Sequence, residues 1–422
     1  MALNNNPNRN FFDKKEILDR QVREEMLFKE FSQSLKKITS LSIGWKKILD
    51  DIDLNNIKNR DDLNAIPITR KSSLATLQKN NYPYGNLTTK PSSKFPFMFA
   101  SPGPIYEPGD YNDFWNMSRS LHAAGLRENQ IAYNTFSYHL GPAGLMMHNA
   151  ANNLGCSVIP GGIGNTELQV DTISNLKPHF YIGTPSFLKI ILENAKKKNK
   201  DVSSIKKGLV GAEPLPESLR NVLLQDGVDV CQMYGIAEVG CIAYETKDNN
   251  NKLINGMILE EDIILEIIRP GTLEALPAGE VGEVVVTKVN TDYPVIRLGT
   301  GDLSKVINEL SPCGRTNYRI QGWMGRAEQS TKFKGIFVNP NQFNEVIRNF
   351  KEVTKVRFII TTKDFLDEGE LLCESITEND DLNNKIKEFF KTNFKLNIKV
   401  SFMKKGGIKN DGLVIEDKRS LK

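Results

Sequence analysis

The sequence predicts an α/β fold: a large N-terminal body with one or more parallel sheets and a small antiparallel or barrel-like unit, then a small α+β C-terminal domain. Between residues 95 and 185, short apolar runs that end in Gly or Pro alternate with helical segments, which is typical of a parallel sheet. Residues 263–268 and 282–287 are strand-like with no helix between them, which indicates an antiparallel unit. After residue 335 the sequence pattern changes again, to helical and strand-like segments. We therefore expect domains at residues 1–328 and 329–422.

The predicted N-terminal body opens with helices. Residues 14–41 carry apolar side chains at helical spacing with charges between them, which predicts an amphipathic helix. A short apolar stretch ending at Pro67 then predicts a turn that leads into another helix. Further along the chain, apolar runs at residues 97–100, 155–159 and 180–182 predict buried strands. Ligands of such a fold gather at the loops that leave the carboxyl ends of the strands.

The predicted C-terminal domain has its own start signal. Asn339 can cap a helix that has Pro340 at its first position, because Pro needs no hydrogen-bond partner there. Strand candidates at residues 356–362 and 398–403 flank a second helix near residues 382–394. This mixture indicates a small α+β unit.

Composition and charge exclude several classes of function. The 422 residues include 55 Lys and Arg against 51 Asp and Glu, a net charge of +4, and the basic residues form no single stripe, so we expect no nucleic-acid partner. The five cysteines show no Cys-x-x-Cys spacing, which favours a reducing compartment and no zinc knuckle. No signal peptide or membrane-length apolar run is present in this sequence. We therefore expect a cytoplasmic protein without a membrane partner.

The loop at residues 94–104 follows a predicted strand, where Gly and Ser can offer backbone N–H groups to a phosphate. Pro102 and Pro104 remove two of these donors, and no Lys follows them. A rigid turn that lines a pocket explains this loop at least as well as a phosphate site does.

A second motif, residues 232–238, contains Tyr234, Gly235 and Glu238. An aromatic ring can stack on a base, Gly lets the backbone approach a ligand, and a carboxylate can hold Mg²⁺ beside phosphates. Taken alone, the motif would be a Tyr-Gly turn with a solvated Glu. It has companions in a fixed order, however, at residues 211–214, 292–302, 313–316 and 325–329.

The order and spacing of these motifs resemble the phenylacetate–CoA ligase family of the adenylate-forming superfamily. The resemblance runs from Arg20 onward and is strongest at residues 208–335. It implies an ATP-dependent, AMP-forming acid–thiol ligase that converts a phenylacetate-like, other aryl or acyl acid to an acyl-adenylate and then to acyl-CoA. It also implies ATP, Mg²⁺ and coenzyme A as cofactors, the acid and CoA as small-molecule partners, and a mobile C-terminal lid. The assembly is open, with a homodimer among the possibilities.

The resemblance also implies roles for single residues. Asp302 would accept hydrogen bonds from the ribose hydroxyls, and Glu328 would be the hinge of the lid. His139 would gate the acyl pocket, although a His among aromatic residues is more often simply packed. The remaining implied roles are an adenine site at Gly211, Ala212, Glu213 and Pro214, a base contact at Tyr234 with Gly235 and Ile236, a catalytic Mg²⁺ contact at Glu238, and a catalytic ribose or phosphate contact at Arg326.

Three positions depart from the family pattern. The phosphate loop lacks the usual Ser, Thr and Gly residues, and Cys313 has no paired cysteines with which to hold zinc. Leu413 stands where the family commonly has a Lys that steers the carboxylate and α-phosphate, and Lys409 or Lys418 could substitute for it. Two alternatives therefore stay open: an adenylating enzyme that passes the acyl group to a carrier protein or an amine, and a catalytically impaired nucleotide- or acyl-binding homologue.

Overall fold

The computed structural model of the chain describes residues 11–101, 103, 105–269, 272–288, 291–324, 327, 331–334, 336–338, 340–363, 366–376, 380–409 and 413–419. The chain forms two compact units. The body comprises residues up to Thr300 together with Ser304–Trp323, and the C-terminal unit comprises Gly301–Leu303 and Met324–Lys422. The predicted boundary at residues 328 and 329 and the mobility of the C-terminal domain stay predictions.

Within the described residues, the largest sheet of the body has nine strands in the order β14-β15-β10-β9-β8-β7-β6-β4-β5. One half is parallel, as the sequence predicts: β4 (Ile131–Asn134), β5 (Ser157–Pro160), β6 (Phe180–Gly183), β7 (Lys207–Val210) and the start of β8 (Asp229–Ile236). The other half is antiparallel and consists of the end of β8, β9 (Gly240–Tyr244), β10 (Met257–Leu259), β15 (Arg319–Ile320) and β14 (Val306–Ile307).

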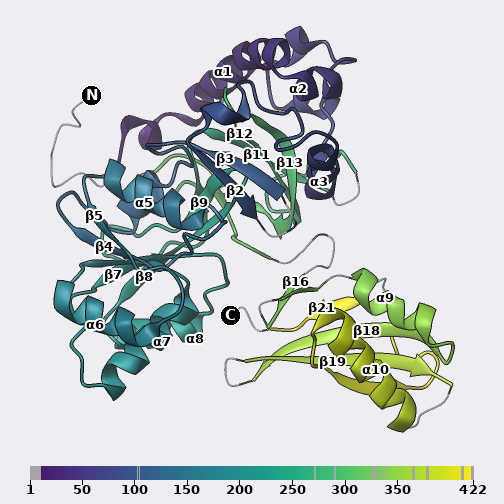
Figure 1. Cartoon of the computed structure of the whole chain (residues 1–422). Helices are drawn as coiled ribbons and strands as arrows, with labels where there is room; N and C mark the ends of the chain where they lie inside the picture. The colour runs from purple at the N-terminus through teal and green to yellow at the C-terminus, as the bar shows by residue number, and fades with distance from the viewer. Residues whose placement is uncertain are drawn as a thin grey trace. The chain divides into compact units, whose positions relative to one another are not determined.

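Helices cover both faces of the parallel half (Figure 1). Phe180 and Ile182 of β6 belong to a core that includes residues of α4 (Ser118–Ala123) and α5 (Ala143–Asn153). Tyr181, which lies between them in the strand, belongs to a separate core. That core includes residues of α6 (Thr166–Leu176), α7 (Pro185–Lys197) and α8 (Glu217–Gln225). Because successive strand residues point to opposite faces, one buried strand contributes to both cores.

A second sheet of the body has the order β1-β13-β12-β11. Its antiparallel pair of β11 (Ile263–Ile268) and β12 (Gly282–Lys288) confirms the predicted unit without a helix. The other strands are β1 (Thr69–Arg70) and β13 (Val295–Ser304), which run parallel. The predicted opening helix is α1 (Arg20–Leu41), which ends at Ser42, the N-cap of α2 (Ile43–Ile48). Its buried face shares one hydrophobic core with this sheet.

The hairpin of β2 (Phe97–Ser101) and β3 (Ile105–Gly109) contains the predicted phosphate loop. Ser101 pairs with Ile105, so only residues 102–104 connect the strands. Gln78 of α3 (Lys71–Asn80) both donates to the carbonyl of Tyr106 and accepts from its N–H, at 2.8 Å each. These contacts fix the hairpin to the helix. Short 3-10 helices lie at Leu54–Asn56, Asp61–Ala65 and Ser92–Lys94.

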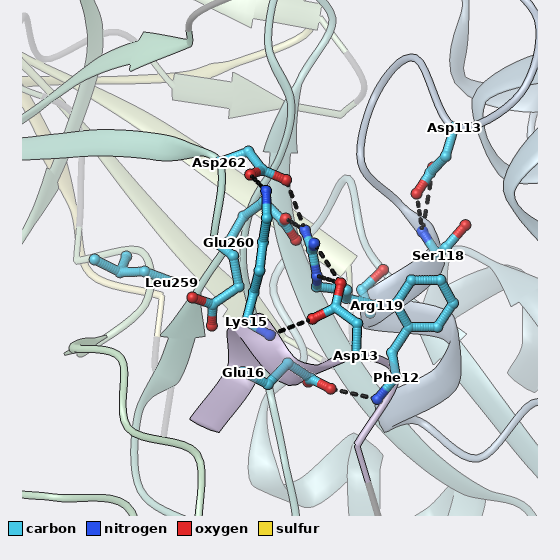
Figure 2. A network of polar contacts seen from close by, with 12 residues as sticks. Phe12, Asp13, Lys15, Glu16, Asp113, Ser118, Arg119, Leu259, Glu260 and Asp262 are labelled. Atoms are coloured by element: carbon cyan, nitrogen blue, oxygen red, sulfur yellow. Dashed lines mark hydrogen bonds and ion pairs between the residues drawn. The ribbon is translucent and has the colours of Figure 1, made fainter. Parts of the chain in front are cut away.

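Buried ion pairs anchor the segment before α1, which includes the 3-10 helix η1 (Lys14–Ile17). The Glu16 carboxylate is fully buried and accepts hydrogen bonds from Arg315 Nε at 2.6 Å and from Tyr244 Oη at 3.1 Å. Figure 2 shows how the Arg119 side chain lies among the carboxylates of Asp13, Glu260 and Asp262. One guanidinium therefore contacts three carboxylates from two distant parts of the sequence.

The C-terminal unit is α+β, as the sequence predicts. Its main sheet has the order β20-β19-β18-β21. The helix that starts at Pro340 is present, whereas its proposed cap, Asn339, lies outside the described residues. The long β19 and the β16–β17 hairpin are absent from the sequence-based prediction. The elements are β16 (Thr331–Phe333), β17 (Ile336–Val338), α9 (Pro340–Asn349), β18 (Val353–Lys363), β19 (Leu366–Ser375), α10 (Asp380–Phe394), β20 (Lys399–Met403) and β21 (Ile415–Asp417). No helix in the described part of the chain combines the length and apolar character that a membrane span requires.

Candidate functional site

The turn between β8 and β9 carries the central motif of the sequence. Glycines allow it to form: a Cβ atom on Gly235 would lie 2.5 Å from the carbonyl oxygen of Gly240, and one on Gly240 would lie 2.1 Å from that of Trp115. Gly240 also has a φ of +92°, which side chains rarely adopt. The Tyr234 hydroxyl donates to Thr300 Oγ1 of β13 at 3.4 Å. The two sheets of the body therefore meet at this tyrosine.

Glu238, in the same turn, is buried and paired. Its side chain is 1% exposed, and the Lys71 ammonium lies 3.0 Å from Oε1 and 3.1 Å from Oε2. The interpretation of the motif as a turn with a solvated Glu is therefore wrong. Lys71 is the first residue of α3. The sequence pattern around it predicts only a turn into a helix, so it gives no signal for this contact.

Glu107 is a second buried carboxylate in this part of the body, and sequence reasoning missed it. It lies on β3 opposite Phe99, is 1% exposed, and accepts a hydrogen bond from Ser101 Oγ at 2.9 Å through Oε2. Its other oxygen, Oε1, has no partner among the described residues. Burial, and secondly repulsion by Glu238, raise the pKa of Glu107 to about 8. The two carboxylates therefore interact, although 131 positions separate them in the sequence.

Loops at the carboxyl ends of β6 and β7 meet beside β8. The N–H of Gly211 donates to the carbonyl of Gly183 at 3.1 Å, and Gln232 Nε2 donates to the Glu213 carbonyl at 3.0 Å. The Glu213 carboxylate accepts from the N–H of Ser186, at the start of α7, at 2.7 Å. Ala212 has a φ of +65°. The structure therefore brings the predicted adenine loop beside β8, the strand that carries Tyr234 near its end, which is the usual ligand position in such a sheet.

The remaining predicted positions lie in several parts of the chain. Asp302 is buried on β13, two residues after Thr300. Arg326 and Glu328 lie outside the described residues, so their roles stay predictions, as do those of Ile236, which ends β8, and Pro214, which is exposed.

His139 is exposed on the loop after β4, and its N–H donates to Ser137 Oγ at 3.0 Å. A packed His139 was the alternative to the gate, and this exposure makes it wrong. The histidine that contacts an aromatic residue here is His148, whose Nδ1 lies 3.2 Å from the Tyr138 hydroxyl. Phe136 and Tyr181 belong to the two separate cores, one on each side of the sheet. Core packing therefore explains these two.

A cavity of about 320 Å³ lies elsewhere in the body, lined in part by Asp113, Asp262 and Lys288. Lys288 is buried, and burial lowers the pKa of its ammonium to about 8. It donates to the carbonyls of Phe114 at 2.6 Å and Val239 at 2.8 Å. Because Val239 follows Glu238 directly, this lysine helps to fix the turn that carries the carboxylate.

In the C-terminal unit, Leu413 is 37% exposed and precedes β21. Arg357 Nε donates to its carbonyl at 3.3 Å and Arg357 Nη2 to that of Lys409 at 3.0 Å. The Lys418 ammonium pairs with Glu416 at 3.2 Å. Whether either lysine replaces the one expected at position 413 stays open.

Comparisons with known proteins agree with this arrangement. Residues 117–291 match the family model of the AMP-binding enzymes. The phenylacetate–coenzyme A ligase of Thermus thermophilus is 30% identical over 347 residues, which cover 78% of this chain and 76% of that relative. The same enzyme of Aromatoleum evansii is 32% identical over 312 residues, or 69% and 67% of the two chains.

Solved structures match nearly the whole chain. A 2-hydroxyisobutyryl-CoA ligase in complex with 2-HIB-AMP and CoA, in its thioesterification state, has a TM-score of 0.79 at 19% identity and covers 99% of this chain and 94% of that one. An open conformation of the same ligase has a TM-score of 0.73. At this level of identity the likeness shows a shared fold.

Proposed function

The chain belongs to the phenylacetate–coenzyme A ligase family of AMP-binding enzymes, and from this membership we propose that it activates a carboxylic acid with ATP and transfers the acyl group to coenzyme A. One structural observation supports this most directly. The loop at Gly211–Glu213 and the segment that carries both Tyr234 and the buried Glu238 come together where the parallel strands end.

The reaction has two steps. A carboxylate oxygen of the acid attacks the α-phosphorus of ATP, the bond to the bridging oxygen breaks, and pyrophosphate leaves. The thiolate of CoA then attacks the acyl carbonyl, and AMP leaves with the electrons of the broken C–O bond. Neither step needs a nucleophile from the protein, so catalysis depends on positioning and charge stabilisation.

The residues have separate parts in this proposal. The loop at residues 211–214 and Tyr234 hold the adenine, with Gly235 and Ile236 shaping the turn. Asp302 and Arg326 hold the ribose and phosphate, while Glu328 is the hinge of a closing C-terminal lid. His139, exposed on its loop, is free to close over the acyl group.

Oxygen ligands suit Mg²⁺, and this part of the body offers them through the buried Glu238 carboxylate and through Glu107 Oε1, which has no partner among the described residues. Glu238 would hold the ion, which would supply neutralisation of phosphate charge. No three His, Cys, Asp or Glu side chains among the described residues form a metal group by themselves. This agrees with a cation that takes its remaining ligands from phosphates and water.

The acceptor and the setting are also part of the proposal. Coenzyme A is the acceptor that the family indicates, with a carrier protein or an amine as alternatives. Five buried thiols fit a reducing compartment such as the cytoplasm. A homodimer stays a prediction that sedimentation equilibrium would test.

A second candidate function, nucleotide or acyl binding without catalysis, has support from two features of the sequence, which involve three positions. Leu413 stands where the family has a Lys, and Pro102 and Pro104 leave the phosphate loop with few N–H donors. Loss of one stabilising group can cost an enzyme about 3–4 kcal/mol of its transition-state stabilisation. A fold that binds nucleotide can therefore lose its reaction.

Hydroxylamine trapping of the acyl-adenylate, with pyrophosphate release measured in parallel, distinguishes the two functions. The panel would include phenylacetate, substituted aryl acids and linear acids. The proposal expects ATP-dependent hydroxamate and pyrophosphate with at least one acid. Intact ATP binding by calorimetry without either product from any acid would favour the binding function. With an active acid, exchange of CoA for a phosphopantetheinyl carrier then identifies the acceptor.

A further inference from the structure

Glu107, Glu238 and Lys71 come together from three separate elements of the body. Glu107 lies on β3, Glu238 lies in the turn after β8, and Lys71 begins α3. Lys71 contacts Glu238 directly and lies within electrostatic range of Glu107, as Glu238 does. Lys71 therefore pairs with one buried carboxylate and acts electrostatically on a second.

The Glu107 carboxylate is only half satisfied by the described residues. Its Oε2 accepts from Ser101, but Oε1 is buried and without a partner among the described residues. A buried carboxylate oxygen without a hydrogen bond is costly, because it has lost the water that solvates it in the unfolded chain. The buried phenol of Tyr84, which also lies within electrostatic range of Glu107, has an unpartnered hydroxyl too. Among the described residues these two polar groups have no hydrogen-bond partner, and a polar or cationic ligand would satisfy them.

Lys71 takes the position that a cation would occupy in front of Glu238. Its ammonium lies at nearly equal distances from both carboxylate oxygens, 3.0 and 3.1 Å. The lysine side chain is 37% exposed and is attached through a flexible four-carbon stem. It can therefore leave Glu238 without unfolding any element.

The hairpin sequence explains why a second carboxylate would be useful. Pro102 and Pro104 have no N–H to donate, and only residues 102–104 join the two strands. A phosphate chain would find few backbone donors there, so more of its charge must be neutralised by a cation. Mg²⁺ is commonly held by one or two carboxylates together with substrate phosphates.

We propose that Glu107 is a second carboxylate ligand of the divalent cation at Glu238, and that Lys71 moves from Glu238 to a phosphate oxygen when cation and nucleotide bind. This rests on the proposed function only in taking a nucleotide as the source of the phosphates. The cation is a hard divalent ion, Mg²⁺ or its stand-in Mn²⁺, which completes its coordination with phosphate oxygens and water.

Mn²⁺ binding tests the inference without turnover. Free Mn²⁺ would be measured by electron paramagnetic resonance during titration of the full chain with α,β-methylene-ATP, which cannot release pyrophosphate. Glu107→Gln is expected to weaken Mn²⁺ binding by about 10- to 100-fold, the range seen when groups around a metal are removed. Glu107→Asp, which keeps the charge, should recover part of the affinity.

Glu260→Gln is the matched control. Glu260 is also a buried glutamate of the body with one unpartnered oxygen, but its partner is Arg119. The Glu260→Gln variant should bind Mn²⁺ with the affinity of the wild type. Lys71→Met should bind Mn²⁺ more tightly than the wild type when nucleotide is absent, because the competing ammonium is gone.

Wild-type affinity in Glu107→Gln, or no Mn²⁺ binding in the wild type with the ATP analogue, would overturn the inference. The proposed function fails by a different result, the absence of hydroxamate and pyrophosphate with every acid, so the two failures can be distinguished. Thermal unfolding of each variant confirms that the folded protein was titrated.

Discussion

The ammonium of Lys71 contacts both carboxylate oxygens of Glu238, at 3.0 and 3.1 Å, across 167 positions of sequence. It joins the first residue of α3 to the turn after β8. Because the Glu238 side chain is 1% exposed, removal of the lysine would leave a buried carboxylate without its ion pair. In the proposed reaction the Lys71 ammonium is available to bind the phosphates of ATP.

Replacement of Lys71 by Met should therefore reduce catalysis strongly. We expect pyrophosphate release with an active acid to fall by about 100-fold, the effect of removing one transition-state stabilising group. The free energy of unfolding should also fall by about 1–3 kcal/mol, because Glu238 loses its ion pair. Initial rates and urea unfolding measure the two effects.

Lys79→Met is the matched control, since Lys79 is exposed in the last turn of the same helix. It should change neither rate nor stability measurably. Equal rates in the two variants would show that Lys71 has no part in the reaction.

Local patterns predict most of the fold. The apolar runs predicted at residues 155–159 and 180–182 correspond to β5, which ends at Pro160, and to β6, which ends at Gly183, and α9 begins at the predicted proline. The sequence does not predict β19, whose residues Leu366–Ser375 alternate poorly and become a strand by pairing with β18 along its whole length. Tertiary pairing outweighs local propensity there.

The candidate site is predicted in part. Motif order identifies Tyr234 and Glu238, but Glu107 and Lys71 lie in segments without a chemical pattern. Their positions in the site result from tertiary contacts. Glu107 is placed by the pairing of β3 with β2, in which it lies opposite Phe99, and Lys71 is placed by the start of α3, where it contacts Glu238. Two prolines in the sequence, Pro102 and Pro104, indicate a turn between β2 and β3. The burial of the nearby Glu107 carboxylate is apparent only from the structure.

The Glu260 cluster predicts a pH dependence of stability. Burial raises the pKa of Glu260 from 4.5 to about 8, although Arg119 opposes the shift. Asp262, Glu261 and Asp113 add repulsion. The native state therefore holds a proton that the unfolded chain releases near its ordinary pKa. Protonated Glu260 therefore contributes to the free energy of unfolding. This contribution is fully present below about pH 4.5 and is lost as the pH rises to about 8.

Glu260→Gln removes this ionisation. Relative to the wild type, the variant should become more stable at pH 8 than at pH 5, as measured by urea unfolding at both values. Glu30→Gln, an exposed glutamate of α1, controls for the substitution itself. A stability difference between the wild type and Glu260→Gln that stays constant with pH would contradict the raised pKa.

Gly183 should tolerate no side chain. A Cβ atom there would lie 1.9 Å from Thr135 Oγ1 and 2.4 Å from the Tyr181 hydroxyl, and these two groups already share a 2.8 Å hydrogen bond. Gly183→Ala should lower the free energy of unfolding by about 1–3 kcal/mol through overpacking. Gly141→Ala, where a Cβ would meet nothing within 4 Å, should be nearly neutral in the same urea titration.

Leu413→Lys tests whether the chain has lost part of its catalytic charge. The family resemblance assigns this position to a cation that steers the carboxylate and α-phosphate. A lysine fits without burial, because Leu413 is 37% exposed. If the wild type is an impaired ligase, pyrophosphate release should rise by about tenfold or more. Leu366→Lys, at an exposed leucine of the same unit, should leave the rate unchanged. Equal rates in the wild type and both variants would show that the missing lysine does not limit the reaction, and would direct attention to the proline-bearing hairpin instead.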